Sequence, residues 1–273
     1  MKAVIPAAGL GTRMLPITKS QPKEMLPVLN KPAIHYVVEE AVNSGCEDIL
    51  IITGRSKRAL EDYFDRNLEL EEFLRKRGKK KELDEIIKIS EMANIMYIRQ
   101  KEPLGLGHAI LLAEKFVGNE PFAILLGDDI IIDDIPATKK LIDVYNKTGD
   151  PVIGVMEVEK HEVNKYGIIK PSHTSNPPIY VIDDVVEKPE IHKAPSNLAI
   201  VGRYVLTPEI FTYLKKIEPG KNGEYQLTDA IKLYLFVRKV LALKIEGVRL
   251  DIGSLESWLE ANIYMGKRLG IIK

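Results

Sequence analysis

Two positively charged side chains lie close behind a loop of small residues near the start of the chain. The loop reads Ala7-Ala8-Gly9-Leu10-Gly11 and follows residues 3–5, an apolar run typical of a buried strand. Small residues let the backbone approach a ligand closely, and consecutive N–H groups in such a loop can surround an anion. Arg13 follows the loop, and Lys23 lies ten residues further on, in the segment PKEMLP. This pattern indicates a polyphosphate site with two fixed positive charges.

Two better-known phosphate loops do not fit these residues. The dinucleotide-binding fingerprint requires a third glycine, where this chain has Met14, and an acidic residue about twenty positions later. No acidic residue ends a strand near position 30. The P-loop requires Gly-Lys followed by Ser or Thr, which this loop lacks. The loop therefore belongs to a polyphosphate site of another type.

A glutamine at a strand end supplies a group that can recognise a base. Residues 94–100 read as a strand that ends in Gln100, and a glycine-rich stretch with Gly105 follows. A carboxamide can accept a hydrogen bond from a ring N–H and donate one to a carbonyl, which matches the edge of a pyrimidine. We therefore predict that Gln100 and the backbone at Gly105 bind the base. His108 is predicted to position this loop rather than to bind a metal.

Carboxylates end the next apolar segment. Residues 121–129 read as a buried strand that ends in Asp128 and Asp129, and ligands of open α/β sheets bind outside the carboxyl ends of the strands. Asp128 is thus placed where a hard cation beside phosphates would lie. For Asp129, Asp133 and Asp134 we predict only turn and capping roles.

The second half of the chain carries residue types suited to a phosphorylated sugar. Gly167 and Gly202 have no side chain and can let a sugar ring lie against the backbone. Glu187 can accept hydrogen bonds from vicinal hydroxyl groups, and Lys188 can neutralise a phosphate as a point charge. These residues are the candidates for a sugar-phosphate half-site.

Alternating strands and helices must position these residues. A helix over 32–44 and a buried strand over 48–54 follow the first strand, which is the βαβ pattern of a parallel sheet. Residues 56–90 read as highly charged helices, in which the lysine run 79–81 is a solvated turn. The remaining predicted elements are helices over 109–116, 137–147, 208–215, 226–237 and 255–269, and strands over 151–159, 166–170, 179–187 and 198–206.

The predicted fold is a Rossmann-like α/β architecture with a mostly parallel sheet and an appended β-rich sugar-binding region. The 273 residues suffice for one large domain, and no flexible linker separates the halves. We predict a single domain, 1–273, in which 1–150 bind mainly the nucleotide and 151–254 mainly the sugar phosphate. Residues 255–273 are expected to form a C-terminal helix.

Composition limits the class of protein further. Lys+Arg and Asp+Glu both number 39, which disfavours a general nucleic-acid or membrane-surface binder. No apolar run is long enough to span a membrane, and the first strand begins at once, which leaves no room for a secretory signal. Cys46 is the only cysteine, so an intramolecular disulfide is excluded and a buried thiol in a reducing cytoplasm is expected.

The loop, Arg13 and PKEMLP together resemble the nucleotide-sugar pyrophosphorylases, and among them most the UTP–glucose-1-phosphate uridylyltransferases. The segments at 165–169, 186–189 and 195–204 match the same family in order and spacing. The resemblance implies a homodimer or homotetramer and a bound Mg²⁺. It assigns the nucleotide to Ala8, Gly9, Gly11, Arg13, Lys23, Gln100 and Gly105, the sugar phosphate to Gly167, Glu187, Lys188 and Gly202, and the metal to Asp128 and Asp251.

The resemblance also implies a reaction, in which UTP and α-D-glucose 1-phosphate give UDP-glucose and pyrophosphate. Arg13, Lys23, Asp128, Lys188 and Asp251 would be its catalytic residues. The turn after Asp251 departs from the bacterial enzymes, which usually carry a Cys and a Gly-Tyr pair there. Two alternatives stay open at this point: a thymidylyltransferase or an enzyme that uses both UTP and dTTP, and a non-catalytic nucleotide-sugar sensor. Uracil and thymine differ by one methyl group, which a pocket distinguishes by only about 1–3 kcal/mol.

Overall fold

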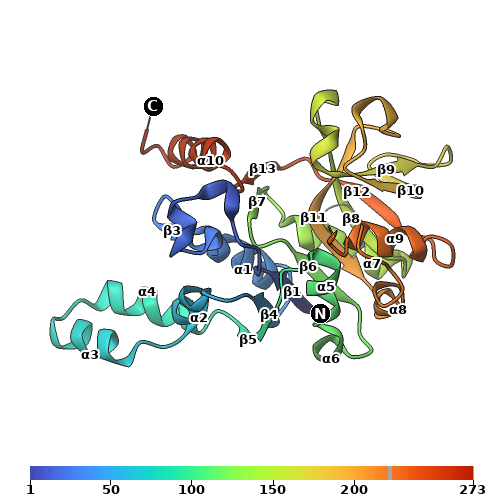
Figure 1. Ribbon diagram of the computed structural model, residues 1–273. Coiled ribbons are helices and arrows are strands. Elements are labelled where there is room, and N and C mark those ends of the chain that lie inside the picture. The colour runs from blue at the N-terminus through green and yellow to red at the C-terminus, as the bar shows by residue number, and fades with distance from the viewer. Residues whose placement is uncertain (221–222, 273) are drawn as a thin grey trace.

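A computed structural model describes residues 1–220 and 223–272 (Figure 1). Within these residues the centre of the molecule is a nine-stranded sheet with helices on both faces. Its strands are, in spatial order, β5 (Asn94–Arg99), β4 (Asp48–Thr53), β1 (Lys2–Pro6), β6 (Phe122–Leu125), β11 (Leu198–Leu206), β8 (Val152–Glu157), β12 (Leu241–Lys244), β10 (Ile179–Glu187) and β9 (Gly167–Pro171).

The sheet is mixed, so the prediction of a mostly parallel sheet is wrong. Strands β5, β4, β1 and β6 are parallel, as the βαβ pattern predicted. Beyond them β11 pairs antiparallel with both β6 and β8, and β10 pairs antiparallel with β12 and β9. β11 is buried along its whole length, which suits a central strand. The strands of the second half thus extend the same sheet and do not form an appended one.

Helices cover the two faces because successive side chains of each strand point to opposite sides. In β1, Ala3 and Ile5 pack with helices α1 (Ala33–Asn43), α2 (Arg58–Phe64) and α7 (Ala137–Thr148). Val4 faces the other side, toward helices α5 (Leu106–Leu111), α8 (Ile210–Leu214) and α9 (Leu227–Tyr234). Each fully buried Ile or Leu in these two layers contributes roughly 1.5–3 kcal/mol. Cys46 is buried just before β4, as expected.

Several predicted elements differ in extent from the observed ones. The helix predicted over 109–116 begins earlier, at Leu106 in α5, and continues after a break as α6 (Glu114–Val117). The helices predicted over 208–215 and 226–237 are shorter, and β12 was not predicted. The strand predicted over 121–129 ends at Leu125, because the chain turns there and leaves the sheet.

After this turn the chain forms a separate two-stranded ribbon. Strand β7 (Asp129–Ile132) pairs antiparallel with β13 (Val248–Asp251), so Asp129 lies opposite Asp251. A helix follows the ribbon directly, and Ser254 and Ser257 form a capping box at the start of this helix, α10 (Leu255–Arg268). Helix α10 packs on the ribbon, and the Trp258 Nε1–H donates to the carbonyl of Pro27 over 2.8 Å. The ribbon therefore brings Asp251, the second carboxylate of the predicted metal site, to the turn that follows β6.

The highly charged segment is helical, as predicted. Helices α3 (Leu68–Lys76) and α4 (Lys80–Ser90) are joined through Gly78, which adopts a left-handed conformation at φ +66°. Figure 1 shows this hairpin projecting from the body of the molecule beside α2. Over the described ranges, none of the helices is both long enough and apolar enough to cross a membrane.

Candidate active site

A cavity of about 510 Å³ opens where the carboxyl ends of the parallel strands meet. The loop after β1 and the turn after β6 form part of its wall, because these strands are parallel neighbours. The segment η3 (Lys23–Met25) and the loop after β5 complete it. Its lining includes the predicted nucleotide residues Ala8, Gly9, Gly11, Lys23, Gln100 and Gly105, together with Asp128 and Lys188.

The glycine-rich loop is held in a conformation that suits Gly11. Its φ is +66°, and an added Cβ would lie 3.0 Å from the Thr18 side chain. The Thr18 hydroxyl donates to the Gly11 carbonyl over 2.8 Å. The loop is therefore shaped by its neighbours before any ligand binds.

Lys23 forms an ion pair with Asp128 across this cavity. Burial would lower the pKa of Lys23, but the negative charges of Asp128 and Glu24 raise it well above its ordinary value. Burial likewise opposes ionisation of Asp128, yet the Lys23 charge and hydrogen bond hold the pKa of Asp128 below its usual value. Both groups are thus charged at neutral pH.

The base-binding candidates form a connected set. The Gln100 amide nitrogen donates to the Gly105 carbonyl over 3.2 Å and to His108 Nδ1 over 2.9 Å. His108 lies at the start of α5 and holds Gln100, which confirms its predicted positioning role. Gly105 has φ +99°, and an added Cβ would lie 2.7 Å from the Tyr225 carbonyl. Both amide N–H groups are used here, so the prediction that they donate to a base carbonyl does not fit the structure, and Gln100 Oε1 is left to accept a bond from a pyrimidine ring N–H.

A second cavity, of about 270 Å³, adjoins the first and is lined by Asp128 and Lys188 as well. Lys188 has φ +44°, unusual for a residue with a side chain, and its ammonium lies 3.3 Å from Glu187 Oε1. The Thr228 hydroxyl donates to Glu187 Oε2 over 2.7 Å. The cavity brings together all the predicted sugar-phosphate residues, Gly167, Glu187, Lys188 and Gly202, with Arg13 and Asp251.

Arg13 was predicted to hold the nucleotide, and the structure places it in the wall of the second cavity. An added Cβ on Gly253 would lie 2.9 Å from both Arg13 Nη2 and Asp251 Oδ1. Arg13 therefore lies over the turn that carries Asp251. Gly202 also has a structural requirement, because its φ is +66° and an added Cβ would lie 2.9 Å from Asp129 Oδ2.

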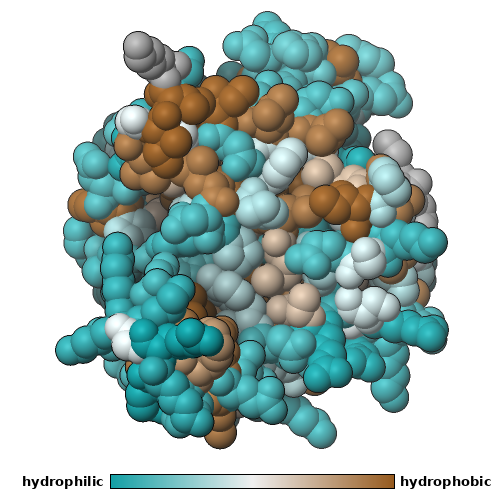
Figure 2. Space-filling model, turned by 90° about the vertical axis from the view of Figure 1, so that its left-hand side faces the viewer, coloured by the Kyte–Doolittle hydropathy of each residue, from teal (hydrophilic) through white to brown (hydrophobic). Residues whose placement is uncertain are grey.

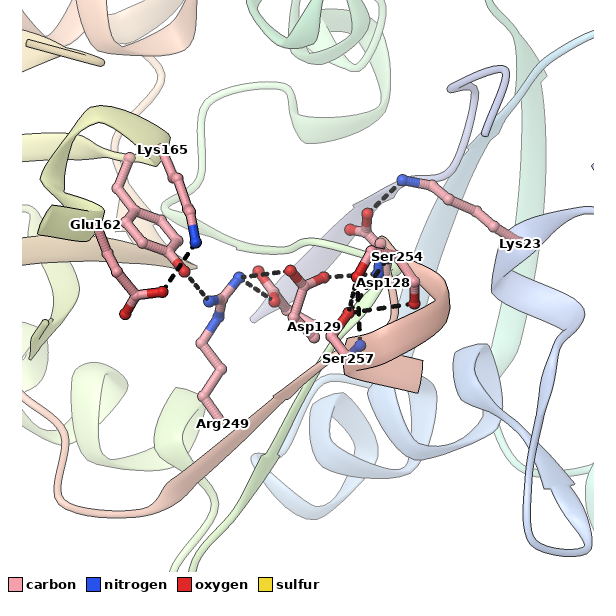
Figure 3. Close-up of polar contacts among 11 residues, drawn as sticks. Lys23, Asp128, Asp129, Glu162, Lys165, Arg249, Ser254 and Ser257 are labelled. Carbon is pink, nitrogen blue, oxygen red and sulfur yellow. Dashed lines mark hydrogen bonds and ion pairs between the residues drawn. The ribbon is translucent and has the colours of Figure 1, made fainter. Parts of the chain in front are cut away.

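Asp129 is part of a buried ion pair, so its predicted turn or capping role is wrong. Arg249 Nη2 lies 2.5 Å from Asp129 Oδ1, and Arg249 Nη1 donates to the Tyr166 hydroxyl over 3.1 Å. Burial, reinforced by the charges of Asp128 and Asp251, raises the pKa of Asp129 to about 6 against the opposing charge of Arg249. In Figure 3, Lys23 approaches Asp128 on one side and Arg249 approaches Asp129 on the other.

Asp133 fits its predicted turn role. Asp133 Oδ1 accepts a hydrogen bond from the backbone N–H of Asp134 over 2.7 Å, and its other oxygen lies 2.6 Å from Lys140 Nζ. Neither Asp133 nor Asp134 is among the residues that line the two cavities.

Arg249 and Thr228 line the second cavity but were not among the site residues predicted from the sequence. Arg249 could have been found, because it precedes Asp251 by two positions in a strand and so shares its face. Thr228 carries no such signal, since its partner Glu187 is 41 residues away. Among residues 1–220 and 223–272, no set of three His, Cys, Asp or Glu side chains is arranged to hold a metal ion without a ligand.

Comparison with known proteins agrees with this geometry. A family model described as nucleotidyl transferase matches residues 2–268. The UTP–glucose-1-phosphate uridylyltransferase YngB of Bacillus subtilis (strain 168) is 55% identical over 265 residues, which cover 97% of this chain and 89% of that protein. UTP–glucose-1-phosphate uridylyltransferase 1 of Staphylococcus saprophyticus is 53% identical over 262 residues, covering 96% of this chain and 91% of that protein.

A solved structure shows the same fold. The crystal structure of a UDP-glucose pyrophosphorylase complexed with UDP-glucose superposes with a TM-score of 0.89 and 46% sequence identity, covering 98% of each chain. This chain therefore belongs to the nucleotidyl transferase family, and within it to the UTP–glucose-1-phosphate uridylyltransferases.

Proposed function

We propose that the protein catalyses the formation of UDP-glucose and pyrophosphate from UTP and α-D-glucose 1-phosphate. One observation carries the proposal: the cavity with the nucleotide residues adjoins the cavity with the sugar-phosphate residues, and Asp128 and Lys188 line both. Two bound substrates would thus have their phosphates side by side at these residues. The relatives that bear the name of this activity match nearly the whole chain.

The reaction needs no nucleophilic side chain. An oxygen of the sugar phosphate attacks the α-phosphorus of UTP in line, a new P–O bond forms, and the bond to the β-phosphate breaks to release pyrophosphate. Catalysis then consists of positioning and charge neutralisation, as in other phosphoryl transfers. Arg13, Lys23 and Lys188 would share the negative charge that two polyanions bring together.

The nucleotide is assigned to the first cavity. Backbone N–H groups of the loop at Ala8, Gly9 and Gly11 would bind phosphate oxygens, and Gln100 with Gly105 would bind uracil. The sugar phosphate is assigned to the second cavity, where Lys188 binds its phosphate and Glu187 accepts bonds from its hydroxyls.

Asp128 and Asp251 are proposed to hold Mg²⁺. The donor set fits this ion, because both carboxylates line the same cavity and Mg²⁺ takes only one or two protein carboxylates beside phosphate and water oxygens. When bound, Mg²⁺ would supply positive charge to the phosphates of both substrates. Lys23 is paired with Asp128 in the structure, so Lys23 would leave this carboxylate to bind phosphate while Asp128 binds the ion.

We assign residues 1–150 mainly to the nucleotide and 151–254 mainly to the sugar phosphate, because most of the residues that line the first cavity come from the first range and most of those that line the second cavity come from the second. We also infer a cytoplasmic homodimer or homotetramer. Leu255, Leu259 and Ile263 expose between 41% and 60% of their surface along one side of α10. Figure 2 shows apolar surface close to the C-terminal end of the chain, and a second copy would remove it from water. Light scattering of the purified protein measures the oligomeric state.

The decisive experiment is a substrate matrix that follows pyrophosphate release. UTP and dTTP are each combined with glucose 1-phosphate and with other hexose 1-phosphates. We expect the highest kcat/KM for UTP with glucose 1-phosphate. A preference for dTTP would instead identify a thymidylyltransferase, and absence of turnover with every pair would leave nucleotide-sugar sensing as the function.

A further inference from the structure

A buried ion pair beneath the first cavity has no part in the reaction above. Lys57 Nζ lies 2.6 Å from Glu24 Oε2, and the two side chains expose only 7% and 1% of their surface. Glu24 belongs to η3 and directly follows Lys23. Lys57 comes from the loop between β4 and α2, at the same edge of the sheet. The pair thus connects the segment that carries Lys23 to a second loop.

The loop with Lys57 is built against the glycine-rich loop. An added Cβ on Gly54 would lie 2.9 Å from the Ala8 carbonyl oxygen, so the two backbones are in close contact. Ser56 has φ +66°, a conformation that costs free energy for a residue with a side chain and that persists only when its surroundings require it. This backbone conformation delivers Lys57 to Glu24.

Glu24 lies close to both partners of the Lys23–Asp128 pair, so that their charges act on it. It neighbours Lys23 in the chain, and its charge raises the pKa of Lys23. Its Cγ would lie 3.5 Å from a Cβ placed on Gly127, the residue before Asp128. The four side chains therefore alternate in charge from the interior to the cavity, in the order Lys57, Glu24, Lys23 and Asp128.

A buried carboxylate must be paired, because burial without a cation is costly. If Lys57 did not hold Glu24, the nearest other cation would be Lys23. We propose that Lys57 is a positioning residue for the triphosphate site: by binding Glu24, it leaves the Lys23 ammonium directed into the cavity. The inference rests on the proposed function, because Lys23 is assigned there to UTP.

The test compares variants of the full-length enzyme. Lys57→Met leaves Glu24 without its partner, and Lys23 should move toward it. We expect the KM for UTP to rise about tenfold, while the KM for glucose 1-phosphate changes less than about twofold. Adding Glu24→Gln to Lys57→Met should restore most of the UTP affinity, because the carboxylate that draws Lys23 away is gone. A purely structural role would not confine the loss and the recovery to the KM for UTP, because it would change the KM for glucose 1-phosphate as well.

Arg58, which follows Lys57 and begins α2, offers a matched control. Its side chain is 86% exposed and lies 3.4 Å from Asp62, so Arg58→Met removes one positive charge without disturbing the buried pair. This variant should keep both KM values. If Lys57→Met does not fold, the double variant still supplies the comparison, since neutral side chains of similar volume can replace a buried ion pair.

Two outcomes would overturn the inference while the wild type makes UDP-glucose. One is a folded Lys57→Met enzyme whose KM for UTP equals that of the wild type. The other is a double variant whose KM for UTP is as high as that of Lys57→Met, or which raises both KM values equally. If the wild type forms no UDP-glucose, the proposed function has failed instead.

Discussion

The two cavities of the active site are built from different kinds of backbone. The first cavity, to which we assign the nucleotide and which we call the nucleotide cavity, is lined mainly by η3 and by loops that follow the parallel strands β1, β5 and β6. The sugar-phosphate cavity is formed by the antiparallel strands β9, β10 and β11 and by the ribbon β7–β13. The first uses short contiguous segments of chain, whereas the second assembles residues that lie far apart in the sequence.

Asp128 and Asp129 show the same contrast at the scale of one peptide bond. The Lys23 charge overcomes burial and lowers the pKa of Asp128, whereas burial raises the pKa of Asp129 to about 6 although Arg249 is its partner. The cation paired with Asp128 is Lys23 of the segment PKEMLP, whereas the cation paired with Asp129 is Arg249 of β13. Two carboxylates that are neighbours in the chain thus differ in pKa because different elements supply their cations.

The largest effect is expected from the two carboxylates that would join the cavities through a metal. Asp128→Asn and Asp251→Asn should each lower kcat by roughly 1,000-fold, which corresponds to about 4 kcal/mol of activation free energy. Each substitution removes a carboxylate ligand of the Mg²⁺ whose charge would balance the phosphates of both substrates. The double variant should be little worse than either one, since both act through one ion. Turnover is measured across a magnesium titration. Near-normal kcat at low magnesium in either variant would remove that residue from the site.

Asp129→Asn separates its role from that of its neighbour. It keeps the side-chain shape but removes the close negative partner of the buried Arg249, whose next carboxylate, Asp251, lies 4.0 Å away. The free energy of unfolding should therefore fall by about 3 kcal/mol. Chemical denaturation measures this change, and Asp128→Asn is the comparison. A structural role for Asp129 would be contradicted if Asp129→Asn altered the magnesium dependence of turnover as strongly as Asp128→Asn does and left the free energy of unfolding unchanged.

Lys188 tests whether the two cavities bind separate substrates. Lys188→Ala removes a charge-assisted contact worth about 1.5–3 kcal/mol and should raise the KM for glucose 1-phosphate far more than the KM for UTP. Lys23→Ala is the matched variant and should show the opposite preference. Equal changes in both KM values for Lys188→Ala would contradict its assignment to the sugar phosphate.

The nucleotide side could be predicted from sequence because its signals are local. Gly9, Gly11 and Arg13 lie within five positions, and the first strand, helix and strand follow with clear periodicity. The structure places all these elements as predicted, with shifts of only one or two residues. Gln100 was also predictable, since it ends a strand beside a glycine-rich loop.

The residues of the sugar side were predicted, but the contacts that support them were not, because those contacts depend on tertiary structure. The break signal in segment 121–129 is Gly127, which was included in the predicted strand although the strand ends at Leu125, so Asp129 was read as a turn or capping residue. Its partner Arg249 is 120 residues further along, on a ribbon that pairs with β7 rather than with the sheet. β12 was missed because only four residues form it. Such short elements are stabilised by their neighbours and not by their own pattern.

The smallest effect is expected at the base. Gln100 Oε1 would accept one neutral hydrogen bond from uracil, and such a bond contributes about 0.5–1.5 kcal/mol, so Gln100→Ala should raise the KM for UTP only about fivefold. Discrimination against purine triphosphates should weaken as well, because the amide is the side chain in this loop that matches a pyrimidine edge. His108→Ala provides the control, since it removes the partner of the amide nitrogen but leaves Oε1 in place. Its effect should be smaller than that of Gln100→Ala and of the same kind. Unchanged base preference in Gln100→Ala would show that uracil is bound through the backbone at Gly105 alone, and the nucleotide cavity would then depend on main-chain recognition for its base as well as for its phosphates.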